Sequence, residues 1–370
     1  MKVAVDCRFG TKSPSGVGKF FIDALIAMVN YQPHWHFFLI SPHDLEGTLL
    51  KSILSCKNVT YIKSNSWRTR SLTFWYNWDY LKESKNVNAD LLWTPAPQIP
   101  FFTPKGMKNL IIVHDVVEKE FADTQDFKGR WIGNIFKKKA ITKSDYIWSI
   151  SCYTKDKINE YYPDRLKNDI VVGCSCSEIF KKNNISKERC DTIKNQMGIK
   201  NRFLLFVGSI EPRKNLQYTL RLMKEYYCRH PDVQLLIVGG RGWKNSYIYD
   251  IVNEDDYPKN AVIFANYVDI KLLVELYNIA DGFISTSLNE GFGLPQLEAM
   301  KCGCPVITAN NSAMTEVVSG RGITVDGWND QDWLAAIDNV LAMQRDKYNP
   351  DLSEFDWENI IQRVKSYLDN

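Results

Sequence analysis

The sequence predicts an α/β protein with two doubly wound domains, each built on a parallel sheet, that face each other across a cleft. Three features of its 370 residues lead to this prediction. Short apolar runs alternate with helical patterns along the chain, these runs form two series, and a polar stretch at 173–201 separates the two. Strands that alternate with helices indicate parallel βαβ units. Ligands bind beyond the carboxyl ends of the strands in such sheets, so functional residues are expected in the loops there.

The N-terminal domain is predicted to span residues 1–180. Its first helix is expected at Val17–Asn30, where Phe20, Ala24 and Met28 recur at helical spacing. The strands expected in this half are Lys2–Asp6, His36–Ile40, Val59–Ile62, Leu91–Trp93, Leu110–Val113, Tyr146–Ile150 and Ile170–Val172.

The C-terminal domain is predicted to span residues 181–353, and a helix is expected near its start at Lys187–Met197. An amphipathic helix is expected at Phe355–Leu368, and the sequence allows the segment 354–370 to pack back on the N-terminal domain. The strands expected in this half are Phe203–Val207, Leu235–Val238, Val262–Phe264, Gly282–Ser285, Val306–Thr308 and Ile323–Val325.

The composition argues against several classes of protein. Hydrophobic residues make up 45% of the chain and charged residues 24%, which is typical of a globular protein. No apolar run reaches the roughly 18 residues that a membrane-spanning helix needs. The first residues are typical of a strand rather than a signal peptide, which predicts a cytoplasmic protein. A net charge of +3 gives no indication of nucleic-acid binding. The nine cysteines lack the spacing of zinc ligands, so no metal is predicted.

The most informative segment lies between Glu290 and Glu298. It places Gly291-Phe292-Gly293-Leu294-Pro295 where a predicted strand is followed by a predicted helix. Pro295 suits the first helical turn, and the glycines allow a ligand to approach the backbone N–H groups at the helix entrance. Carboxylates that accept from sugar hydroxyls, beside amides that bind anions, indicate a site for a sugar that carries phosphate. A capped helix with a solvated glutamate at each end is the alternative.

Three further loops follow predicted strands. The loop Gly208–Asn215 contains Arg213 and Lys214, two adjacent cations that can neutralise a diphosphate. His114 can contact a sugar hydroxyl or stabilise developing charge. Gly16-Val17-Gly18 leads into a helix as a phosphate-binding loop does, but it lacks the complete dinucleotide fingerprint and the P-loop spacing. This absence argues against a nicotinamide dehydrogenase. Each loop alone also fits an ordinary turn.

Two other patterns have simpler explanations. The aromatic residues between Trp67 and Tyr80 alternate with Arg68 and Arg70, a pattern compatible with stacking on bases, contact with a membrane interface or binding of sugar rings. A helix packed after the third strand explains them better. Asp330-Gln331-Asp332 resembles a metal-binding triplet, but the start of a helix explains these acids better.

In their order along the chain, these segments resemble the retaining glycosyltransferases of family 4, which have the GT-B fold of two Rossmann-like domains. The resemblance covers nearly the whole chain. The Glu-x7-Glu segment with its Gly-Phe-Gly-Leu-Pro interior is its most specific part. The segments that support it are Gly16-Val17-Gly18, His114-Asp115, Gly208 through Asn215, Glu290 through Ala299, and Gly303-Cys304-Pro305-Val306-Ile307.

The resemblance implies a role for each acidic residue of the Glu-x7-Glu segment. Glu298 would bind the ribose of the nucleotide, and Glu290 would bind hydroxyls of the donor sugar. Sugar or phosphate would contact the backbone amides of Gly291, Phe292, Gly293 and Leu294.

The other expected contacts come from both halves. Arg213 and Lys214 would neutralise the diphosphate, and Gly16-Val17-Gly18 would close over it from the other domain. His114 would lie near the reacting carbon of the sugar. Many members of this family have an arginine where this chain has Ser209, so the phosphate contacts are expected to differ here, with Arg213 in place of the missing charge.

The implied reaction transfers a hexose from a nucleotide diphosphate sugar to an acceptor hydroxyl with retention of configuration, with no metal and no cofactor. The Glu-Pro-Arg-Lys-Asn form is similar to bacterial mannosyltransferases of surface polysaccharide (O-antigen) assembly, which favours GDP-mannose as the donor. Donors with UDP-linked sugars and GDP-fucose stay open.

The expected acceptor is a glycan or a lipid-linked oligosaccharide at the cytoplasmic face of the inner membrane. Peripheral membrane contact is suggested by Lys137-Lys138-Lys139 and by the aromatic residues of 67–80.

Three other functions remain compatible with the sequence. The first is a catalytically silent homologue that serves as a binding subunit. The others are a nucleotide-sugar epimerase and a phosphorylase, which would use a similar fold. The sequence leaves the oligomeric state open.

Overall fold

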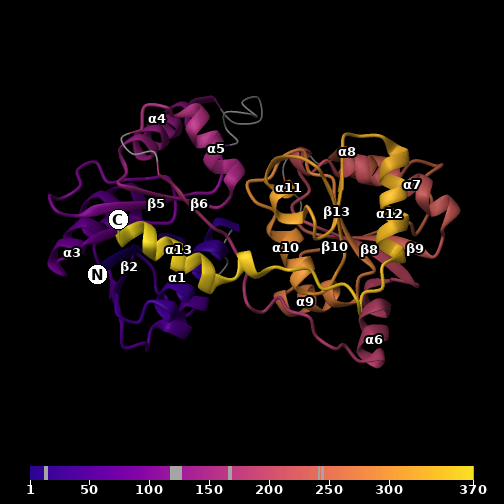
Figure 1. Cartoon of the computed structure of the whole chain (residues 1–370), viewed down its shortest axis with the longest axis horizontal. Coiled ribbons are helices and arrows are strands. Elements are labelled where there is room, and N and C mark those ends of the chain that lie inside the picture. The colour runs from indigo at the N-terminus through magenta and orange to yellow at the C-terminus, as the bar shows by residue number, and fades with distance from the viewer. Residues whose placement is uncertain (12–15, 117–126, 166–168, 241, 243–245, 370) are drawn as a thin grey trace. The chain divides into compact units, whose positions relative to one another are not determined.

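The computed structural model describes residues 1–11, 16–116, 127–165, 169–240, 242 and 246–369. These residues form two units, each with its own sheet (Figure 1). The N-terminal unit contains Met1–Ser175 and Ser353–Asn370, and the C-terminal unit contains Cys176–Leu352. Both units are α/β, as the alternation of strands and helices in the sequence predicts.

The N-terminal unit is built on a seven-stranded parallel sheet with the order β3-β2-β1-β4-β5-β6-β7. The order reverses between β1 and β4, and this switch point is where ligands bind in open α/β sheets. The interior strand β1 has the burial pattern of a strand covered on both faces, because helices pack on either side. The strands are β1 (Lys2–Asp6), β2 (His36–Ser41), β3 (Val59–Lys63), β4 (Leu91–Thr94), β5 (Lys108–Val113), β6 (Tyr146–Ser149) and β7 (Val171–Val172).

The C-terminal unit has a six-stranded parallel sheet with the order β10-β9-β8-β11-β12-β13. Its order reverses between β8 and β11. The strands are β8 (Arg202–Val207), β9 (Val233–Val238), β10 (Val262–Asn266), β11 (Gly282–Ser285), β12 (Val306–Ala309) and β13 (Ile323–Val325). Every strand expected from the sequence is present in the two sheets, with ends that shift by two residues at most.

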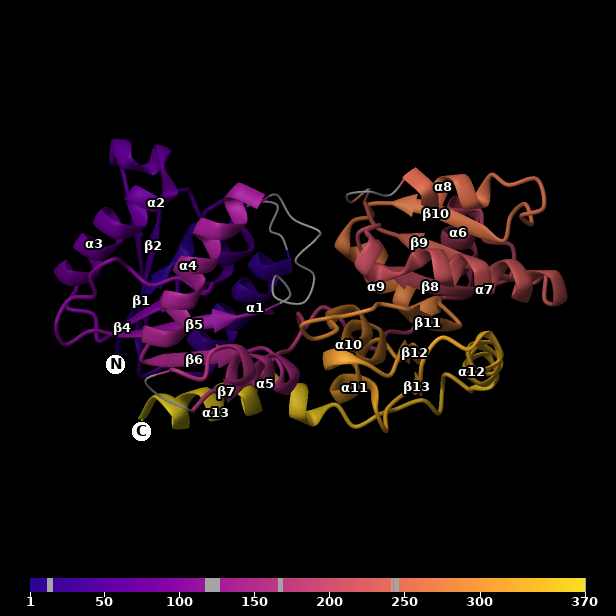
Figure 2. The same cartoon turned by 90° about the horizontal axis from the view of Figure 1, so that it is seen from above.

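Helices connect the strands and cover the sheets (Figure 2). In the N-terminal unit they are α1 (Gly16–Tyr31), α2 (Leu72–Trp75), α3 (Leu81–Asn86), α4 (Phe127–Lys143) and α5 (Cys152–Tyr161). In the C-terminal unit they are α6 (Lys187–Met197), α7 (Leu216–Arg229), α8 (Ser246–Val252), α9 (Ile270–Ile279), α10 (Leu294–Lys301), α11 (Ser312–Val318) and α12 (Asp330–Ala342).

The last helix, α13 (Trp357–Asp369), returns to the N-terminal unit, against which it lies in Figures 1 and 2. Its apolar side is buried, as the amphipathic pattern of the tail requires. The ring of Trp357 lies 5.7 Å from that of Phe20 on α1. Gly173, after β7, leaves room for Ile360, because a Cβ at Gly173 would lie 2.6 Å from the Ile360 Cγ2 atom.

The aromatic segment after β3 forms a short helical stretch that is half buried. Trp75, Tyr76 and Tyr80 lie in the core, as expected for a packed helix. Phe74 and Trp78 are about half exposed, with their ring centroids 5.4 Å apart. The segment therefore supports the core with one side and presents aromatic rings to the surface with the other.

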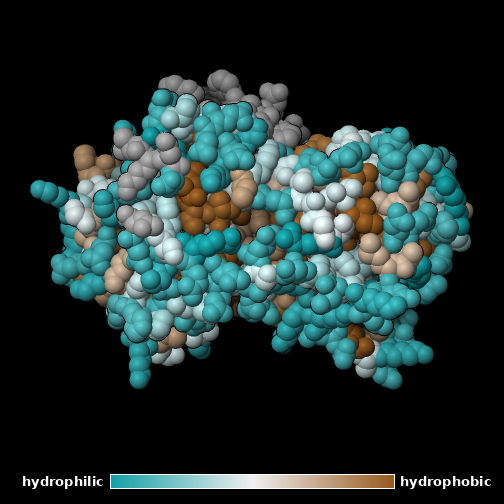
Figure 3. Space-filling view, viewed as in Figure 1, coloured by the Kyte–Doolittle hydropathy of each residue, from teal (hydrophilic) through white to brown (hydrophobic). Residues whose placement is uncertain are grey.

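The surface is dominated by hydrophilic residues on the face drawn in Figure 3, with hydrophobic residues showing between them. Within the described part of the chain, no helix has the length and apolar character to cross a membrane. The cysteines are free thiols, and both C-x-C pairs, Cys174/Cys176 and Cys302/Cys304, are buried.

Candidate functional site

The candidate site of the C-terminal unit lies at the switch point of its sheet, where β8 and β11 end. Gly208 follows β8 and Gly239 follows β9, and both have positive φ values, +153° and +157°. A Cβ at Gly239 would lie 1.9 Å from the carbonyl oxygen of Gly208. Glycine is therefore required at Gly239, because any side chain would push the two strand ends apart.

A partly buried ion-pair cluster joins the loops that follow β8 and β11. The Lys214 Nζ atom lies 2.5 Å from Glu290 Oε1. Arg213 donates to the other oxygen of the same carboxylate, Glu290 Oε2, at 2.6 Å. Ser287 donates its hydroxyl to Glu290 Oε1 at 2.8 Å. Asn215 turns the chain into α7 with a left-handed conformation (φ 51°) that asparagine tolerates. The sequence-predicted residues Arg213, Lys214 and Glu290 are thus in direct contact.

The charges of this cluster keep Glu290 ionised. Burial by itself would raise the pKa of Glu290, but the ammonium of Lys214 and the guanidinium of Arg213 outweigh it and hold the pKa at about 2. The same pairing raises the pKa of Arg213 in spite of its burial. At neutral pH the site therefore holds a carboxylate between two cations.

The two cations are held differently. The guanidinium of Arg213 donates to three acceptors, the carbonyl of Asn289 at 2.7 Å and the carboxylates of Glu290 and Glu211 at 2.6 and 2.7 Å. Lys214, in contrast, has one acceptor among the described residues, Glu290 Oε1. An ammonium has three N–H donors, so Lys214 retains two for another acceptor. Arg213 holds the Glu290 carboxylate in place, whereas Lys214 retains the capacity to bind an anion.

Helix α10 begins next to this cluster. Its N-cap is Gly293, in a left-handed conformation (φ 114°) and without a side chain to cap the helix, and Pro295 stands in the first turn as expected. The backbone N–H of Glu290 donates to the Ser312 hydroxyl at 3.0 Å, which ties this loop to α11. The loop Gly291-Phe292-Gly293-Leu294 thus presents the N-terminal end of a helix, which attracts anions, beside the ion pairs.

Glu298 lies in the second turn of α10, partly exposed. The buried hydroxyl of Tyr277, on α9, donates to Glu298 Oε2 at 2.9 Å. Burial raises the pKa of Tyr277, and the charge of Glu298 adds to this rise, so the phenol keeps its proton and fixes the carboxylate. Glu298 is therefore a positioned acceptor.

The N-terminal unit contains the remaining predicted residues. His114 follows β5, where its Nε2 atom lies 3.0 Å from the carbonyl oxygen of Pro95. The pKa of His114 is lowered to about 4, mainly by burial; the hydrogen bond to the Pro95 carbonyl opposes this shift, and the charge of Lys137 adds to it. The ring is therefore neutral at pH 7. Because a carbonyl can only accept, Nε2 has the proton and Nδ1 is left as an acceptor.

Gly16, Val17 and Gly18 form the first turn of α1. Gly16 is exposed and Gly18 is buried. The residues 12–15 just before them lie outside the described residues. Among the described residues, no group of three or more His, Cys, Asp or Glu side chains is arranged to hold a metal ion.

The sequence analysis gave no role to four residues around the cluster. They share no pattern in the sequence, because each reaches the site from a different loop or helix. They are Glu211 and Ser287, which bind Arg213 and Glu290, and Tyr277 and Ser312, which bind Glu298 and the backbone of Glu290.

Comparison with known proteins relates this chain to glycosyltransferases. Residues 191–354 match the family of glycosyl transferases group 1. The chain is 34% identical over 179 residues to the O-antigen chain mannosyltransferase B of Escherichia coli, a match that covers 45% of each protein and so spans about half the length of that relative. It is 24% identical over 324 residues to the O-antigen chain mannosyltransferase RfbU of Salmonella typhimurium, covering 86% of this chain and 85% of that one.

The fold has a counterpart among solved structures. The crystal structure of HepE from Anabaena in complex with UDP-glucose superimposes with a TM-score of 0.70 at 15% identity and covers 100% of this chain and 99% of that one. A likeness at this identity establishes the fold, which is the two-domain α/β fold of the GT-B glycosyltransferases. The sequence match adds that residues 191–354, in the C-terminal unit, form a glycosyl transferases group 1 domain.

Proposed function

We propose that this protein is a retaining, metal-independent glycosyltransferase that transfers mannose from GDP-mannose to a glycan or lipid-linked oligosaccharide in the assembly of a surface polysaccharide. The observation that supports this proposal most directly is the sharing of the Glu290 carboxylate between Lys214 and Arg213 at the switch point of the sheet. The cluster offers cations for a diphosphate and a carboxylate for a sugar.

Lys214 is the residue that we expect to bind the diphosphate. Its ammonium lies at the end of β8 with two N–H donors left after its bond to Glu290. A pair of opposite charges about 4 Å apart gains roughly 4 kcal/mol at an effective dielectric constant of 20. The attraction grows as the bond to the sugar breaks and the diphosphate gains charge, so Lys214 would favour departure of the nucleoside diphosphate.

Glu290 is the residue that we expect to bind the sugar. Three hydrogen bonds from described residues occupy three of the roughly four acceptor positions of its carboxylate. The remaining position, on Oε2, accepts one sugar hydroxyl. Glu298, fixed by Tyr277, is expected to accept from the ribose of the nucleotide, while the amides of Gly291 to Leu294 bind sugar or phosphate.

The proposed reaction needs no covalent intermediate with the protein. The bond from the anomeric carbon to the diphosphate oxygen breaks, and a bond to the acceptor oxygen forms on the same face of the sugar. The proton of the acceptor hydroxyl passes to the departing phosphate, and nucleoside diphosphate leaves. We expect His114 to accept a hydrogen bond from a sugar hydroxyl through Nδ1, because its Nε2 proton is engaged by Pro95. The roles of His114 and of Gly16, Val17 and Gly18 stay predictions.

The choice of sugar rests on the relatives. Both curated relatives described above are named O-antigen chain mannosyltransferases. HepE was solved with UDP-glucose, so UDP-linked donors stay the alternative.

The experiment that tests the function is the release of GDP from GDP-mannose, measured with and without an acceptor glycan. Acceptor-dependent release supports the transferase, whereas release that ignores the acceptor, or none with any donor, contradicts it and favours an epimerase or a silent binding subunit.

A thermal-shift comparison of GDP with UDP tests the base separately. A ligand that binds the native state raises the melting temperature by an amount that grows with its affinity. We expect GDP to raise it more than UDP does. A larger rise of the melting temperature with UDP would indicate a UDP-linked donor instead of GDP-mannose. The proposed class of reaction would be unaffected.

We also propose that the N-terminal unit contacts a membrane through an aromatic patch. The patch consists of Phe74, Trp78, Phe101, Phe102 and Phe136, all exposed, and Phe102 is 86% exposed. The side chain of Asn77, next to Trp78, accepts from the backbone N–H of Phe101 at 2.8 Å, and the Phe101 and Phe136 rings lie 5.8 Å apart. The Asn77 bond links the segment that holds Phe74 and Trp78 to the one that holds Phe101 and Phe102.

Cations accompany the aromatic patch, as expected for an anionic lipid surface. Lys139 lies over the Phe101 ring, with Nζ 6.0 Å from its centroid, and Lys138 is exposed beside it. Lys137 is turned inward, where its ammonium donates to the carbonyl of Asp115 at 2.9 Å. Two of these three lysines, Lys138 and Lys139, therefore contribute charge to this surface. Aromatic rings with neighbouring cations suit the lipid headgroup region.

Liposome co-sedimentation tests the aromatic patch. We expect the protein to bind vesicles that contain anionic phospholipid at low salt, and to bind less with Phe102→Ser/Trp78→Ser, because the double variant removes apolar surface. Tyr267→Ser, which removes an exposed ring of the C-terminal unit, is the matched control. Equal binding of the wild type and the patch variant would contradict this proposal.

A further inference from the structure

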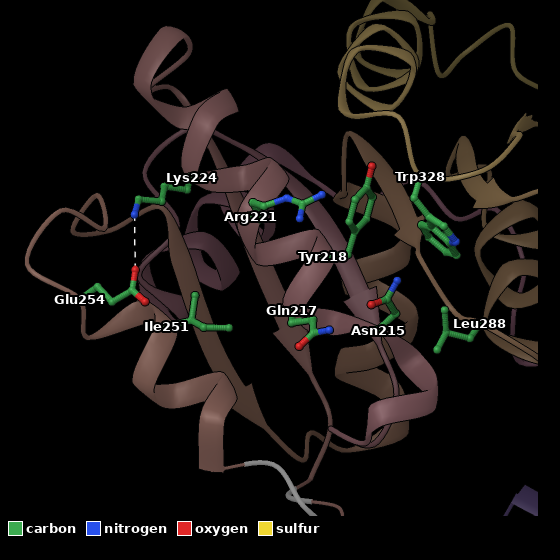
Figure 4. Close-up of a pocket in the computed structure, with 9 residues that line it drawn as sticks. All are labelled: Asn215, Gln217, Tyr218, Arg221, Lys224, Ile251, Glu254, Leu288 and Trp328. Carbon is green, nitrogen blue, oxygen red and sulfur yellow. Dashed lines mark hydrogen bonds and ion pairs between the residues drawn. The ribbon is translucent and has the colours of Figure 1, made fainter. Parts of the chain in front are cut away.

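The C-terminal unit has a groove of about 780 Å³ beside α7, separate from the residues of the ion-pair cluster (Figure 4). Tyr218 and Trp328 lie toward one end of the groove, and Lys224 and Glu254 toward the other. Its volume is within the range of pockets that bind small molecules. Gln217, exposed on α7, adds a polar side chain between the two ends.

Trp328 forms a rigid aromatic platform in this groove. Its ring stacks on that of the buried Trp333 at 5.9 Å and an angle of 3°, and the edge of Tyr218 meets it at 5.1 Å. The turn that holds Trp328 is fixed, because the Trp333 indole donates to the carbonyl of Gly327 and Asn329 caps α12. Trp328 nevertheless remains 40% exposed. A tryptophan held so firmly and still open is suited to stacking against a ligand.

The charges along the groove are already balanced by partners of the opposite sign. Arg221 pairs with Asp330 at 2.8 Å, and Lys224 pairs with Asp256 at 2.7 Å and with Glu254 at 3.4 Å. The Arg221 guanidinium also lies over the Tyr218 ring, 4.8 Å from its centroid. A phosphate would have to compete with these carboxylates, whereas a neutral ligand with many hydroxyls meets both donors and acceptors. This charge pattern favours an uncharged polar ligand over a nucleotide.

We infer that this groove binds a neutral oligosaccharide, as a glycan site distinct from the site of sugar transfer. One face of a hexose ring presents C–H groups that pack on the open part of Trp328, and its hydroxyls meet the amide of Gln217 and the charged side chains of the groove. The groove lies close to the ion-pair cluster along the chain. Asn215 and Leu288 line it, and their neighbours Lys214 and Asn289 belong to the cluster or contact it. A glycan held here would stay near the reaction site between transfers.

The test measures binding of α-linked mannotetraose by saturation-transfer NMR and calorimetry. We expect Trp328→Ala to weaken binding at least tenfold and Gln217→Ala to weaken it severalfold. Gln217 is exposed, so its replacement leaves the fold intact even if loss of Trp328 disturbs the turn. Trp67→Ala, which removes a tryptophan that is 71% exposed in the N-terminal unit, is the matched control and should bind as the wild type does.

Two further measurements separate this inference from the proposed reaction. Lys214→Ala should bind mannotetraose as tightly as the wild type, and GDP should not displace the glycan. Unchanged binding in both groove variants would overturn the inference, and so would loss of binding in Lys214→Ala, because it would place the glycan at the ion-pair cluster. If the protein releases no GDP with any acceptor but binding still depends on Trp328, the transferase proposal fails and the glycan groove stands.

Discussion

The two sheets reverse their strand order in the same way, but their switch points are occupied differently. In the N-terminal unit, β1 ends at Asp6, whose carboxylate is fully buried and pairs with Arg8 at 2.6 Å. The Arg8 guanidinium lies 4.2 Å from the centroid of the Tyr76 ring. In the C-terminal unit, β8 ends before Gly208, and the cations lie on the loop beyond it.

This difference separates a structural ion pair from one suited to binding. The Asp6–Arg8 pair fills its own switch point, with side-chain exposures of 0% and 8%. At the other switch point, glycines replace side chains, and Lys214 retains donors that no described residue engages. We therefore expect replacement of Arg8 to lower the stability of the fold and replacement of Lys214 to lower turnover.

The largest expected effect is that of Arg8→Ala on stability. The substitution leaves the buried carboxylate of Asp6 without its cation, which costs about 3–5 kcal/mol. Chemical denaturation measures the loss, and the double variant Asp6→Asn/Arg8→Gln is the control, because it removes both charges and should recover part of it. If Arg8→Ala is as stable as the wild type, the Asp6–Arg8 ion pair does not stabilise the fold.

The second effect is that of Lys214→Ala on turnover. Loss of a group that stabilises the transition state costs about 10²–10³ in kcat, or about 3–4 kcal/mol. Steady-state release of GDP measures it, and the melting temperature shows whether the fold is kept. Lys259→Ala, which removes an exposed lysine of the C-terminal unit outside the groove and the cluster, is the matched control and should keep its turnover. Near-normal turnover in a folded Lys214→Ala protein would contradict the role of Lys214 in the reaction.

The smallest effect is a dependence of stability on pH that differs between the units. The pKa of His114 is lowered to about 4, so its neutral ring stabilises the folded state above pH 6.5, and this contribution is lost as the pH falls from 6.5 towards 4. Glu290, with a pKa of about 2, loses its contribution only as the pH falls from about 4.5 to 2. Each contribution is at most about 3 kcal/mol.

Denaturation of the wild type and of His114→Gln between pH 7 and pH 4.5 measures the first contribution. We expect the stability of the wild type to fall over this range and that of His114→Gln to change less. Parallel stability curves for the two proteins would show that the pKa of His114 in the folded protein is close to its ordinary value.

The sequence predicted the strands well, and its candidate residues Arg213, Lys214 and Glu290 are in contact in the structure, because strands and this motif have local signals. Strands follow from apolar runs between turns, and the Glu290 to Glu298 segment combines glycine, proline and acidic residues at a strand-to-helix junction. Lys137, in contrast, turned inward although its neighbours face outward, because Asp115 lies beneath it in the fold. The contact of Tyr277 with Glu298 joins two helices and leaves no local signal. Contacts of this kind depend on how helices pack, which a single sequence does not show.

The return of α13 to the N-terminal unit has a consequence for biosynthesis. The ribosome makes residues 1–175 first, but Gly173 and Phe20 receive their partners Ile360 and Trp357 only after residues 176–352 have emerged. The C-terminal unit can therefore complete its fold first, although domains made earlier usually fold earlier. Until the last helix is translated, the apolar surface that α13 covers in the N-terminal unit stays without its partner.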